Sequence, residues 1–417
     1  MSRRLLLLLS LTCAVGVGTL YFPQAITPLV ADGLGEPTDA AALVVTATQI
    51  GYTAGIFLLV PLGDRLPNRS LLVTLLGLTG IALLAAGCAP VLPALVALSG
   101  VIGVTTVAAQ IISPMAAGLV PADRRGSVVG TLMSGSIGGM LLARTFGGTL
   151  GEWLGWRAPY LAAGTVVLLL AAVLARVLPA GAAPPASHRP YPALLAEPLR
   201  LLRTEPELRR SCFYQATVFA GFSAAWTCLP LLLTGPAYGL GAQAVGLLAL
   251  VGAATMVCTP LAGRLADRRG PDPVNLVCLV GTLASAGVLA AGGWGGAAGM
   301  TALVVGTLVL DVAMQSGMVA NKTRVYALDP DARGRLNTAY MSCAYLGGSA
   351  GSWLGLRAHD RAGWPGVCTL VAVLAALALA RHLLPPRRDR TAAGRAAGTG
   401  TAAGATAPAD ATPARPA

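Results

Sequence analysis

The stretch Gly263–Gly270 reads GRLADRRG and places three arginines and one aspartate between two long hydrophobic runs. A weaker copy, VPLGDRLPNR at Val60–Arg69, ends a hydrophobic run in the first half of the chain. In both copies the aspartate, Asp64 or Asp267, is followed directly by an arginine. The same charged loop at two places predicts a chain built from two similar halves.

Long hydrophobic runs dominate the rest of the sequence. Of the 417 residues, 55% are hydrophobic and 11% are charged, whereas a soluble globular protein has about 25% charged residues. A helix of about 20 apolar residues crosses the bilayer core, and we count twelve runs of suitable length. They occupy residues 5–30, 41–62, 71–89, 93–119, 127–150, 158–178, 209–234, 243–262, 275–292, 297–320, 336–356 and 366–384. The pattern predicts an all-α integral membrane protein with twelve transmembrane helices in a lipid bilayer.

A second series of matches, offset by about 208 residues, relates the two sets of six runs. The matched pairs are Arg125-Gly126 with Arg333-Gly334, Met133-Ser134 with Met341-Ser342, Gly139 with Gly347, Gly147 with Gly355, and Gly155-Trp156 with Gly363-Trp364. Two six-helix bundles related by a parallel repeat are the build of a rocking transporter, with the substrate site between them. We therefore expect two pseudo-symmetric six-helix bundles.

A segment rich in proline and charge separates the two sets of runs. The tail beyond the last run is rich in alanine, threonine and glycine, a composition typical of disorder. The predicted organisation is an N-terminal bundle at 1–178, a cytoplasmic linker at 179–208, a C-terminal bundle at 209–385 and a disordered cytoplasmic tail at 386–417.

The arginines predict the orientation in the membrane. Most of the 29 lysines and arginines fall on one side, whereas the loops of the other side hold only Arg157, Arg357 and Arg361. Cytoplasmic loops carry an excess of basic residues, so we expect both termini of this multi-pass chain in the cytoplasm. Because the basic residues are spread between apolar runs, they do not form the patch that nucleic-acid binding needs.

Several kinds of chemistry are not indicated. The eight cysteines form no CxxC pair, the three histidines lie far apart, and no HExxH motif occurs, so the patterns of a zinc site are absent. The single lysine, Lys322, follows Asn321, so the Gly-Lys pair of a Walker A loop is absent as well. We expect no metal, no cofactor and no enzymatic activity.

The loop Gly263–Gly270 and the stretch Asp311–Gly351, with RGRLN at Arg333–Asn337, carry a family resemblance. Over roughly residues 5–384 the chain resembles the major facilitator superfamily, and within it bacterial twelve-span efflux proteins of the drug:proton antiporter type. With this resemblance we expect a monomer in a bacterial plasma membrane. The resemblance implies alternating access of a cavity lined by the first, fourth, seventh and tenth helices. It also implies a cytoplasmic gating loop, made here by Asp64, Arg65, Arg69, Gly263, Asp267 and Arg268.

Such an aspartate can act as a latch for a physical reason. At a helix end it can accept charge-assisted hydrogen bonds from a neighbouring helix N-terminus or from an arginine, and lose them when the bundles move. The loop arginines have a second interpretation, because Arg65, Arg69 and Arg268 can simply hold the loops in the cytoplasm by the positive-inside effect. The sequence leaves both interpretations open.

One acid and one base lie well inside the predicted spans, Asp311 in the tenth run and Arg144 in the fifth. A charge at mid-membrane costs at least about 2.5–3.5 kcal/mol, so such residues usually face a cavity or a partner. A carboxylate at this depth can exchange a proton as the cavity opens to either side, which makes Asp311 and Arg144 the proton-coupling candidates. Two alternatives stay open: a fixed Asp–Arg pair that holds helices together, and binding of an anionic substrate group by Arg144.

Uncharged polar residues complete the candidate substrate cavity, and each of the four cavity-type helices offers at least one amide. The candidates are Tyr21, Gln24, Gln110, Gln215, Gln315 and Asn321. Asp311 and Gln315 are four residues apart and therefore share one helical face. Neighbouring backbone groups can equally satisfy buried amides.

Together these features predict a secondary active transporter: proton-coupled efflux of a small molecule by alternating access. The alternative is proton-coupled uptake of a small nutrient, since the two directions differ mainly in which state the proton and the substrate prefer. A membrane-embedded enzyme is disfavoured, because the spans hold no motif-spaced pair of acids, histidine cluster or nucleophile elbow. A channel, whose flux would not saturate, is disfavoured as well.

Overall fold

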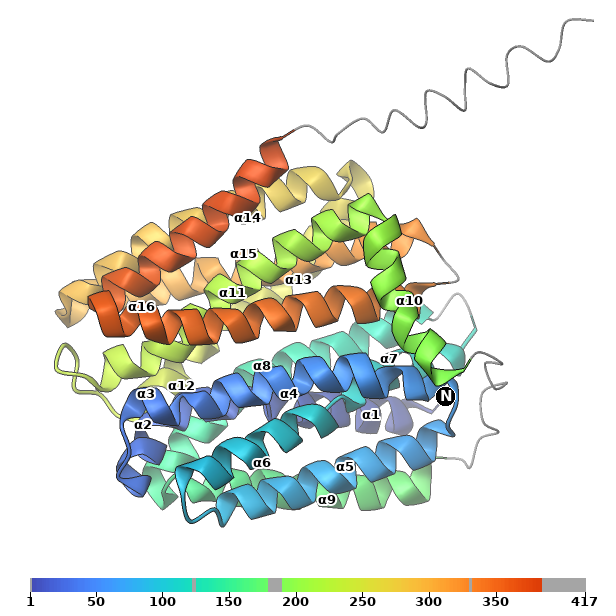
Figure 1. Ribbon diagram of the computed structural model, residues 1–417, viewed down its shortest axis with the longest axis horizontal. Helices are drawn as coiled ribbons and strands as arrows, with labels where there is room; N and C mark the ends of the chain where they lie inside the picture. Colours follow the sequence, from blue (N-terminus) through green and yellow to red (C-terminus); the bar gives the residue numbers. More distant parts are fainter. Residues whose placement is uncertain (1, 122–124, 179–189, 330–331, 385–417) are drawn as a thin grey trace, which may run out of the picture. The chain divides into compact units, whose positions relative to one another are not determined.

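The computed structural model describes residues 2–121, 125–178, 190–329 and 332–384. Within these ranges all regular secondary structure is helical (Figure 1). The contacts considered below lie within one compact unit, Met1–Leu379.

The first half of the chain contributes six membrane-crossing segments, two of which are broken into a pair of helices. The bounds are α1 (Arg3–Gly18) with α2 (Phe22–Leu34), α3 (Thr38–Ala41), α4 (Leu43–Leu59) with η1 (Val60–Asp64), α5 (Asn68–Gly87), α6 (Leu92–Thr105) with α7 (Ala108–Gly118), α8 (Arg125–Leu154) and α9 (Arg157–Val177).

The second half follows the helix α10 (Tyr191–Thr204). Its helices are α11 (Pro206–Thr234), α12 (Ala242–Val251) with η3 (Gly252–Ala254) and α13 (Thr255–Arg269), α14 (Pro271–Ala291) with η4 (Gly292–Trp294), α15 (Gly296–Leu328) and α16 (Arg333–Leu383). α16 is two helices joined across a kink at Ala362 and Gly363. Gly363 has a φ of 60°, a backbone conformation that glycine adopts without steric cost.

The predicted count of twelve crossings is confirmed. Ten segments of the described residues are long and apolar enough to cross a membrane. One of them is the whole of α16, whose 51 residues provide two crossings, one on each side of the kink. The helix α8 adds the twelfth, because its 30 residues, at about 1.5 Å per residue, exceed the hydrocarbon thickness of a bilayer. The chain is therefore an all-α, multi-pass membrane protein.

The breaks in the first and fourth crossings lie side by side. Thr19 follows the end of α1, and Thr106 follows the end of α6. Their hydroxyl oxygens are 3.0 Å apart and share a hydrogen bond. Tyr21 and Gln110 come shortly after these two breaks, and both side chains line the cavity described below.

The two halves repeat one another in how their helices touch. In the first half, a methyl group on Gly139 of α8 would lie 2.0 Å from the carbonyl oxygen of Ala14 in α1. In the second half, a methyl group on Gly347 of α16 would lie 2.2 Å from the carbonyl oxygen of Ala216 in α11. Equivalent glycines therefore allow equivalent helix pairs to approach closely, as the offset of 208 residues predicts.

One helical turn further along, the two halves place the glycine of the contact on different helices of the equivalent pair. In the first half Gly18 of α1 faces Ala143 of α8, and a methyl on Gly18 would lie 3.3 Å from the Ala143 Cβ. In the second half Ala220 of α11 faces Gly351 of α16, where an added methyl would lie 2.1 Å from the Ala220 carbonyl oxygen. Each crossing pairs one glycine with one alanine, so the pseudo-symmetry holds at the contact even where the residues are exchanged.

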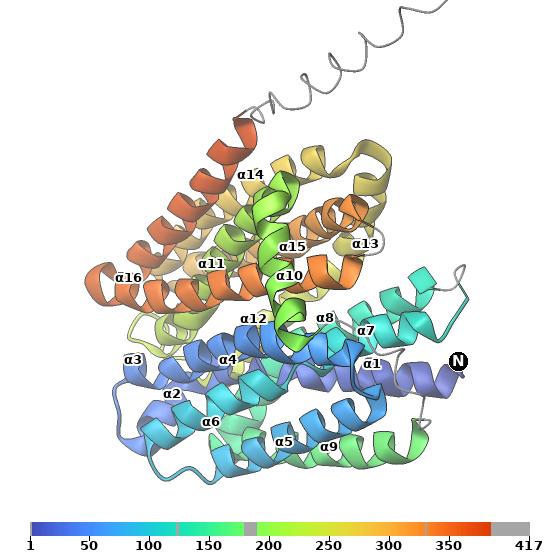
Figure 2. The same ribbon diagram turned by 45° about the vertical axis from the view of Figure 1, so that its right-hand side comes forward.

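The described part of the linker is a helix that touches both halves. The hydroxyl of Tyr191 in α10 donates to the carbonyl oxygen of Leu58 in α4 at 2.5 Å. Glu197, also in α10, forms an ion pair of 3.6 Å with Arg335 in α16. Figures 1 and 2 show α10 lying across the ends of the helices, and we call this end of the molecule the linker side.

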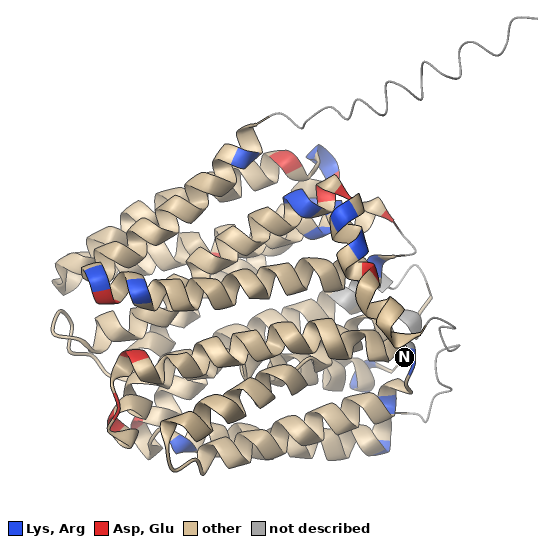
Figure 3. Cartoon of the chain, in the orientation of Figure 1, with Lys and Arg blue, Asp and Glu red and all other residues tan. Residues whose placement is uncertain are grey.

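Charged residues lie mainly at the helix ends, and most of them are on the linker side (Figure 3). The remaining residues of the predicted linker, 179–189, and the predicted tail, 386–417, lie outside the described residues. The division of the chain at 178, 208 and 385 stays a prediction.

Candidate functional site

A cavity lies between the two halves and is lined by Tyr21, just before α2, and by residues of α1, α4, α7, α8, α11, α15 and α16. The volume open to the centres of water-sized molecules is about 110 Å³. A single water needs about 10–15 Å³ of such volume, so the cavity has room for a small organic molecule.

Methionine is the commonest residue of the lining. Five of the nine methionines of the chain face the cavity, and they are Met133, Met140, Met314, Met318 and Met341. The thioether side chain is flexible and polarisable, so it adapts to ligands of different shape. The lining can therefore accept an apolar body without a fixed outline.

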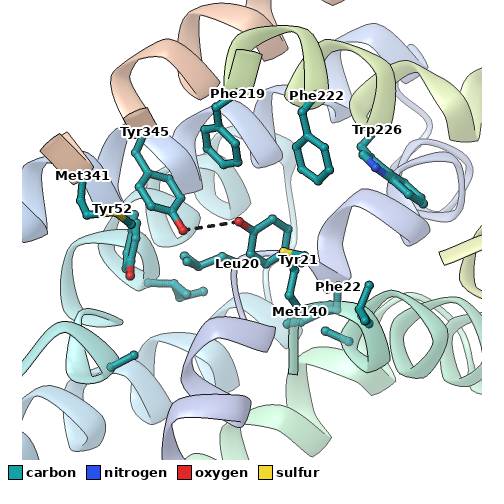
Figure 4. Packing of buried hydrophobic residues seen from close by; sticks show 14 of the residues in the cluster. Leu20, Tyr21, Phe22, Tyr52, Met140, Phe219, Phe222, Trp226, Met341 and Tyr345 are labelled. Atoms are coloured by element: carbon teal, nitrogen blue, oxygen red, sulfur yellow. Dashed lines mark hydrogen bonds between the residues drawn. The ribbon is translucent and has the colours of Figure 1, made fainter. Parts of the chain in front are cut away.

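An aromatic cluster joins the halves beside the cavity (Figure 4). The ring of Tyr345 in α16 meets the ring of Tyr52 in α4 edge-on, with centroids 4.5 Å apart, and the ring of Phe219 in α11 at 5.0 Å. The hydroxyls of Tyr345 and Tyr21 are 3.4 Å apart. Tyr21 and Tyr52 belong to the first half, and Phe219 and Tyr345 to the second, so the cluster links the halves directly.

The two charged residues of the predicted spans are buried, with exposed fractions of 0% for Arg144 and 1% for Asp311. The Nε of Arg144 donates to the Oε1 of Gln24 at 2.9 Å, and the guanidinium carbon lies 4.0 Å from the ring centre of Trp226. The Nε1 of Trp226 donates to the Oδ1 of Asp311 at 2.9 Å. Gln24 and Arg144 belong to the first half, and Trp226 and Asp311 to the second. The four side chains, which we call the interface network, therefore span the boundary between the halves.

Several polar atoms of the interface network are unsatisfied. Both terminal nitrogens of Arg144, the Oδ2 of Asp311 and the Nε2 of Gln24 are buried without a hydrogen-bond partner among the described residues. The ion pairs of the described residues do not include one between Arg144 and Asp311. These atoms are free to bond to water, a proton or an alternative partner. Because unpaired buried polar atoms are costly, such a partner would stabilise the network.

The interface network lies one helical turn beyond the cavity, away from the linker side. Met140 and Gln315 line the cavity, whereas Arg144 and Asp311, four residues away on the same helices, do not. The Nε2 of Gln315 approaches the sulfur of Met140 at 3.6 Å, which joins α15 to α8 between the cavity and the network. A change in the network can therefore reach the cavity through a single helical turn.

Three helices present the same stripe to the interior, with residues at positions i, i+4, i+7 and i+11. The stripes are Met133, Ile137, Met140 and Arg144 in α8, Gln215, Phe219, Phe222 and Trp226 in α11, and Asp311, Gln315, Met318 and Lys322 in α15. This spacing keeps residues on one face of an α-helix. Each stripe joins cavity residues to a member of the interface network.

The structure gathers four of the six predicted substrate-cavity residues around the cavity: Tyr21, Gln110, Gln215 and Gln315. Gln24 belongs instead to the interface network. Asn321 does not line the cavity; its Oδ1 accepts from the Nδ2 of Asn275 at 3.2 Å within the second half.

The residues of the predicted gating loop are spread over the linker side. Arg65, Asp267 and Arg268 are exposed, and Gly263 packs near Val319. Arg69 donates to the carbonyl oxygen of Ala175 near the end of α9, where a cation complements the helix dipole. The side chain of Asp64 lies outside the described residues.

The sequence did not predict an ion-pair cluster that lies on the linker side. Asp272, in the first turn of α14, pairs with Arg210 of α11 at 3.0 Å and with Arg324 of α15. Glu207 lies 3.5 Å from each of these arginines. Asp272 therefore joins the ends of three helices, a contact that the loop signature does not reveal.

Trp226 and Lys322 were also missed, each for a simple reason. A neutral tryptophan in a span looks like packing, and Lys322 falls beyond the predicted run 297–320. α15 continues to Leu328, so Lys322 is part of the helix and lines the cavity. The stripes in α11 and α15 are the signal that could have found both residues.

Comparisons with known proteins agree with this architecture. A family model described as the Major Facilitator Superfamily matches residues 7–352, and a second match covers 248–412. The uncharacterized transporter YgaY of Escherichia coli O157:H7 is 34% identical over 375 residues, which cover 90% of this chain and 94% of the relative. A chloramphenicol resistance protein of Streptomyces lividans is 31% identical over 283 residues, 67% of this chain and 70% of the relative.

Among solved structures, a bacterial homologue of the human lysosomal transporter Spinster shares the fold. It aligns with a TM-score of 0.68 over 91% of this chain and 95% of its own, at 16% sequence identity. Twelve helices in two repeated halves, the family match and these relatives lead to one conclusion. The chain belongs to the major facilitator superfamily, and it is a multi-pass membrane protein that works as a secondary transporter of small molecules by alternating access.

Proposed function

We propose that the protein exports a small amphipathic molecule from a bacterial cytoplasm in exchange for protons, and that Asp311 carries the proton. The observation behind this proposal is the interface network, in which a buried carboxylate and a buried guanidinium from opposite halves meet on the two sides of Trp226. Everything else about the coupling follows from what protonation does to this arrangement.

Ionised Asp311, which accepts the hydrogen bond of Trp226 within its own half, attracts Arg144 of the other half and so draws the two halves together. Protonation removes the charge and with it most of this attraction. The halves then separate more easily at this end, beyond the cavity. A proton bound from one side of the membrane would thus change the relative stability of the two conformations, which is what coupling requires.

The lining of the cavity and one relative support export of an amphipathic compound. Methionines and aromatic rings accommodate an apolar body, and the amides Gln110, Gln215 and Gln315 offer hydrogen bonds to polar groups. The relative from Streptomyces lividans is a chloramphenicol resistance protein, and resistance is consistent with removal of a drug from the cell.

We place the linker side and both termini in the cytoplasm and take the protein to be a monomer. The concentration of basic residues on that side supports the orientation (Figure 3). In this orientation the predicted gating loop is cytoplasmic. Asp267 is exposed and hence available to latch the cytoplasmic side in another conformation.

Transport in membrane vesicles of opposite orientation tests the proposal. Inside-out vesicles with an acidic lumen should accumulate chloramphenicol, or an active member of a panel of amphipathic compounds, against its gradient. The variant Asp311→Asn should lose this accumulation, whereas the exposed Asp32→Asn, a matched change, should keep it. Accumulation only in right-side-out vesicles placed in acidic medium would show uptake instead, and flux that ignores the pH gradient would refute proton coupling.

A further inference from the structure

Lys322 is the only lysine of the chain, and its side chain lines the cavity. None of the other lining residues carries a formal charge. The carboxylate of Asp311 lies outside the lining, and its Oδ1 accepts a hydrogen bond from Trp226. The electrostatics of the cavity are therefore those of one positive charge in an otherwise neutral, largely apolar space.

This charge has no counter-ion among the described residues. The acids of the linker side, Asp272 and Glu207, pair with Arg210 and Arg324, and none of the ion pairs in the described part of the chain includes Lys322. Lys322 is partly buried, and a partly buried cation without a partner gives up part of its hydration at a cost in free energy. A ligand that brings a negative charge would remove that cost.

Two amides of the lining also have unused bonding capacity. Gln215 and Gln315 are each 2% exposed, and the Nε2 of Gln215 and the Oε1 of Gln315 have no hydrogen-bond partner among the described residues. The hydroxyl of Tyr340 donates to the Oε1 of Gln215 at 2.9 Å. Because this bond holds the Gln215 amide in place, its Nε2 is the end left to donate to a ligand.

We infer that the substrate is a small organic anion: a carboxylate bound by Lys322 and Gln215, attached to an apolar or aromatic body that lies among the methionines and the Tyr21, Phe219 and Tyr345 rings. This inference rests on the proposed function, to which it adds the substrate class. An organic cation is selected against, since it would meet the charge of Lys322 and find no acid in the lining.

Matched ligands with one, two or three aromatic rings test the substrate class. Each ring system is offered as the carboxylate, the primary amide and the aminomethyl cation, and binding to the full chain in lipid nanodiscs is measured by calorimetry. For at least one ring size the carboxylate should bind about tenfold or more tightly than its amide, the range of a hydrogen bond to a charged group. The amine should bind most weakly.

Variants assign the effect to Lys322. Lys322→Gln should remove the advantage of the carboxylate over the amide, and Lys322→Arg should keep most of that advantage. Arg264→Gln, which removes an exposed positive charge outside the cavity, should change nothing. Equal binding of carboxylate and amide, tighter binding of the amine, or no carboxylate binding at any ring size would overturn the inference.

The two proposals can fail separately. Proton-driven export of neutral or cationic compounds by a protein that ignores carboxylates would refute the anion and keep the proposed function. Carboxylate binding that depends on Lys322, without any flux driven by a pH gradient, would keep the anion and refute the proton coupling.

Discussion

The guanidinium of Arg144 lies face-on to the indole of Trp226, 4.0 Å from the ring centre, across the boundary between the two halves. The same indole donates its N–H to Asp311. One side chain thus touches a buried base with its face and a buried acid with its edge, and it connects the two charged residues.

Trp226→Phe should show how much the hydrogen bond from the indole N–H to Asp311 contributes. Phenylalanine keeps an aromatic face for Arg144 but leaves the Oδ1 of Asp311 without its donor, a loss of about 1.5–3 kcal/mol for a bond to a charged group. We expect proton-driven flux to fall about tenfold or more, while the substrate Kd changes little because Trp226 does not line the cavity. Trp153, which is 70% exposed, gives the matched control Trp153→Phe. Equal flux in the two variants would contradict the role assigned to Trp226.

Asp311→Asn should separate coupling from transport. Asparagine can still accept the hydrogen bond of Trp226 but cannot carry a proton, so we expect accumulation driven by a pH gradient to disappear. Exchange of labelled for unlabelled substrate, which needs no net proton movement, should continue. Loss of both activities in a correctly inserted protein would assign Asp311 a structural role.

Gly252→Ala should displace the carboxylate of Asp311, because the new methyl group would meet its Oδ2. A methyl group there would lie 2.6 Å from the Oδ2 of Asp311 and 2.7 Å from the side chain of Leu141. Overpacking of this kind costs about 1–3 kcal/mol, which thermal unfolding in detergent would register as a lower Tm. Gly77 has no neighbouring atom in the way, so Gly77→Ala should leave the Tm unchanged or raise it. A neutral Gly252→Ala would mean that the Asp311 side chain moves freely.

The exchanged glycine in the second half makes a paired prediction. Gly351→Ala alone should lower the Tm, because its methyl would meet the backbone of Ala220 at 2.1 Å. Adding Ala220→Gly gives the residue pair that Gly18 and Ala143 form in the first half. Glycine keeps the backbone atoms that the new methyl meets, so part of the loss is recovered only if α11 and α16 settle at the spacing of α1 and α8. Strictly additive effects in this double-mutant cycle would show that the two positions do not share one contact.

The response of the flux to a membrane potential should distinguish export of the anion from its uptake. If one proton enters for each singly charged anion that leaves, every cycle carries two positive charges inward. Each charge gains about 2.3 kcal/mol from a potential of 100 mV, so a potential set with valinomycin should drive export strongly. Uptake of the same anion with one proton would carry no net charge. Flux that does not respond to the potential would therefore contradict anion export at this stoichiometry.

The sequence predicted the features that depend on local pattern. Hydrophobic runs gave the twelve crossings, the spacing of Gly139 and Gly347 gave the repeat, and two ionisable residues in apolar runs pointed to the interior. The glutamines of the lining were predicted by the same argument, because a polar side chain inside a membrane span usually faces a cavity or a hydrogen-bond partner.

Features that depend on distant parts of the chain were out of reach. That Trp226 stands between Arg144 and Asp311 follows from how α8, α11 and α15 pack together, and no local pattern encodes it. The ion pairs of Asp272 depend on which helix ends lie close to Arg210 and Arg324. Lys322 was overlooked because hydropathy ends the tenth run before the helix itself ends.

The exchange of glycine and alanine between Gly18–Ala143 and Ala220–Gly351 has a consequence for how this chain can vary. The steric requirement belongs to a pair of facing positions: one of the two residues must be glycine, and either position can hold it. A scan of single substitutions would score Gly351 as intolerant and Ala220 as permissive, and would miss the rule that both obey. Substitutions at such crossings should arise as correlated couples, and a comparison of the halves position by position will understate how alike they are.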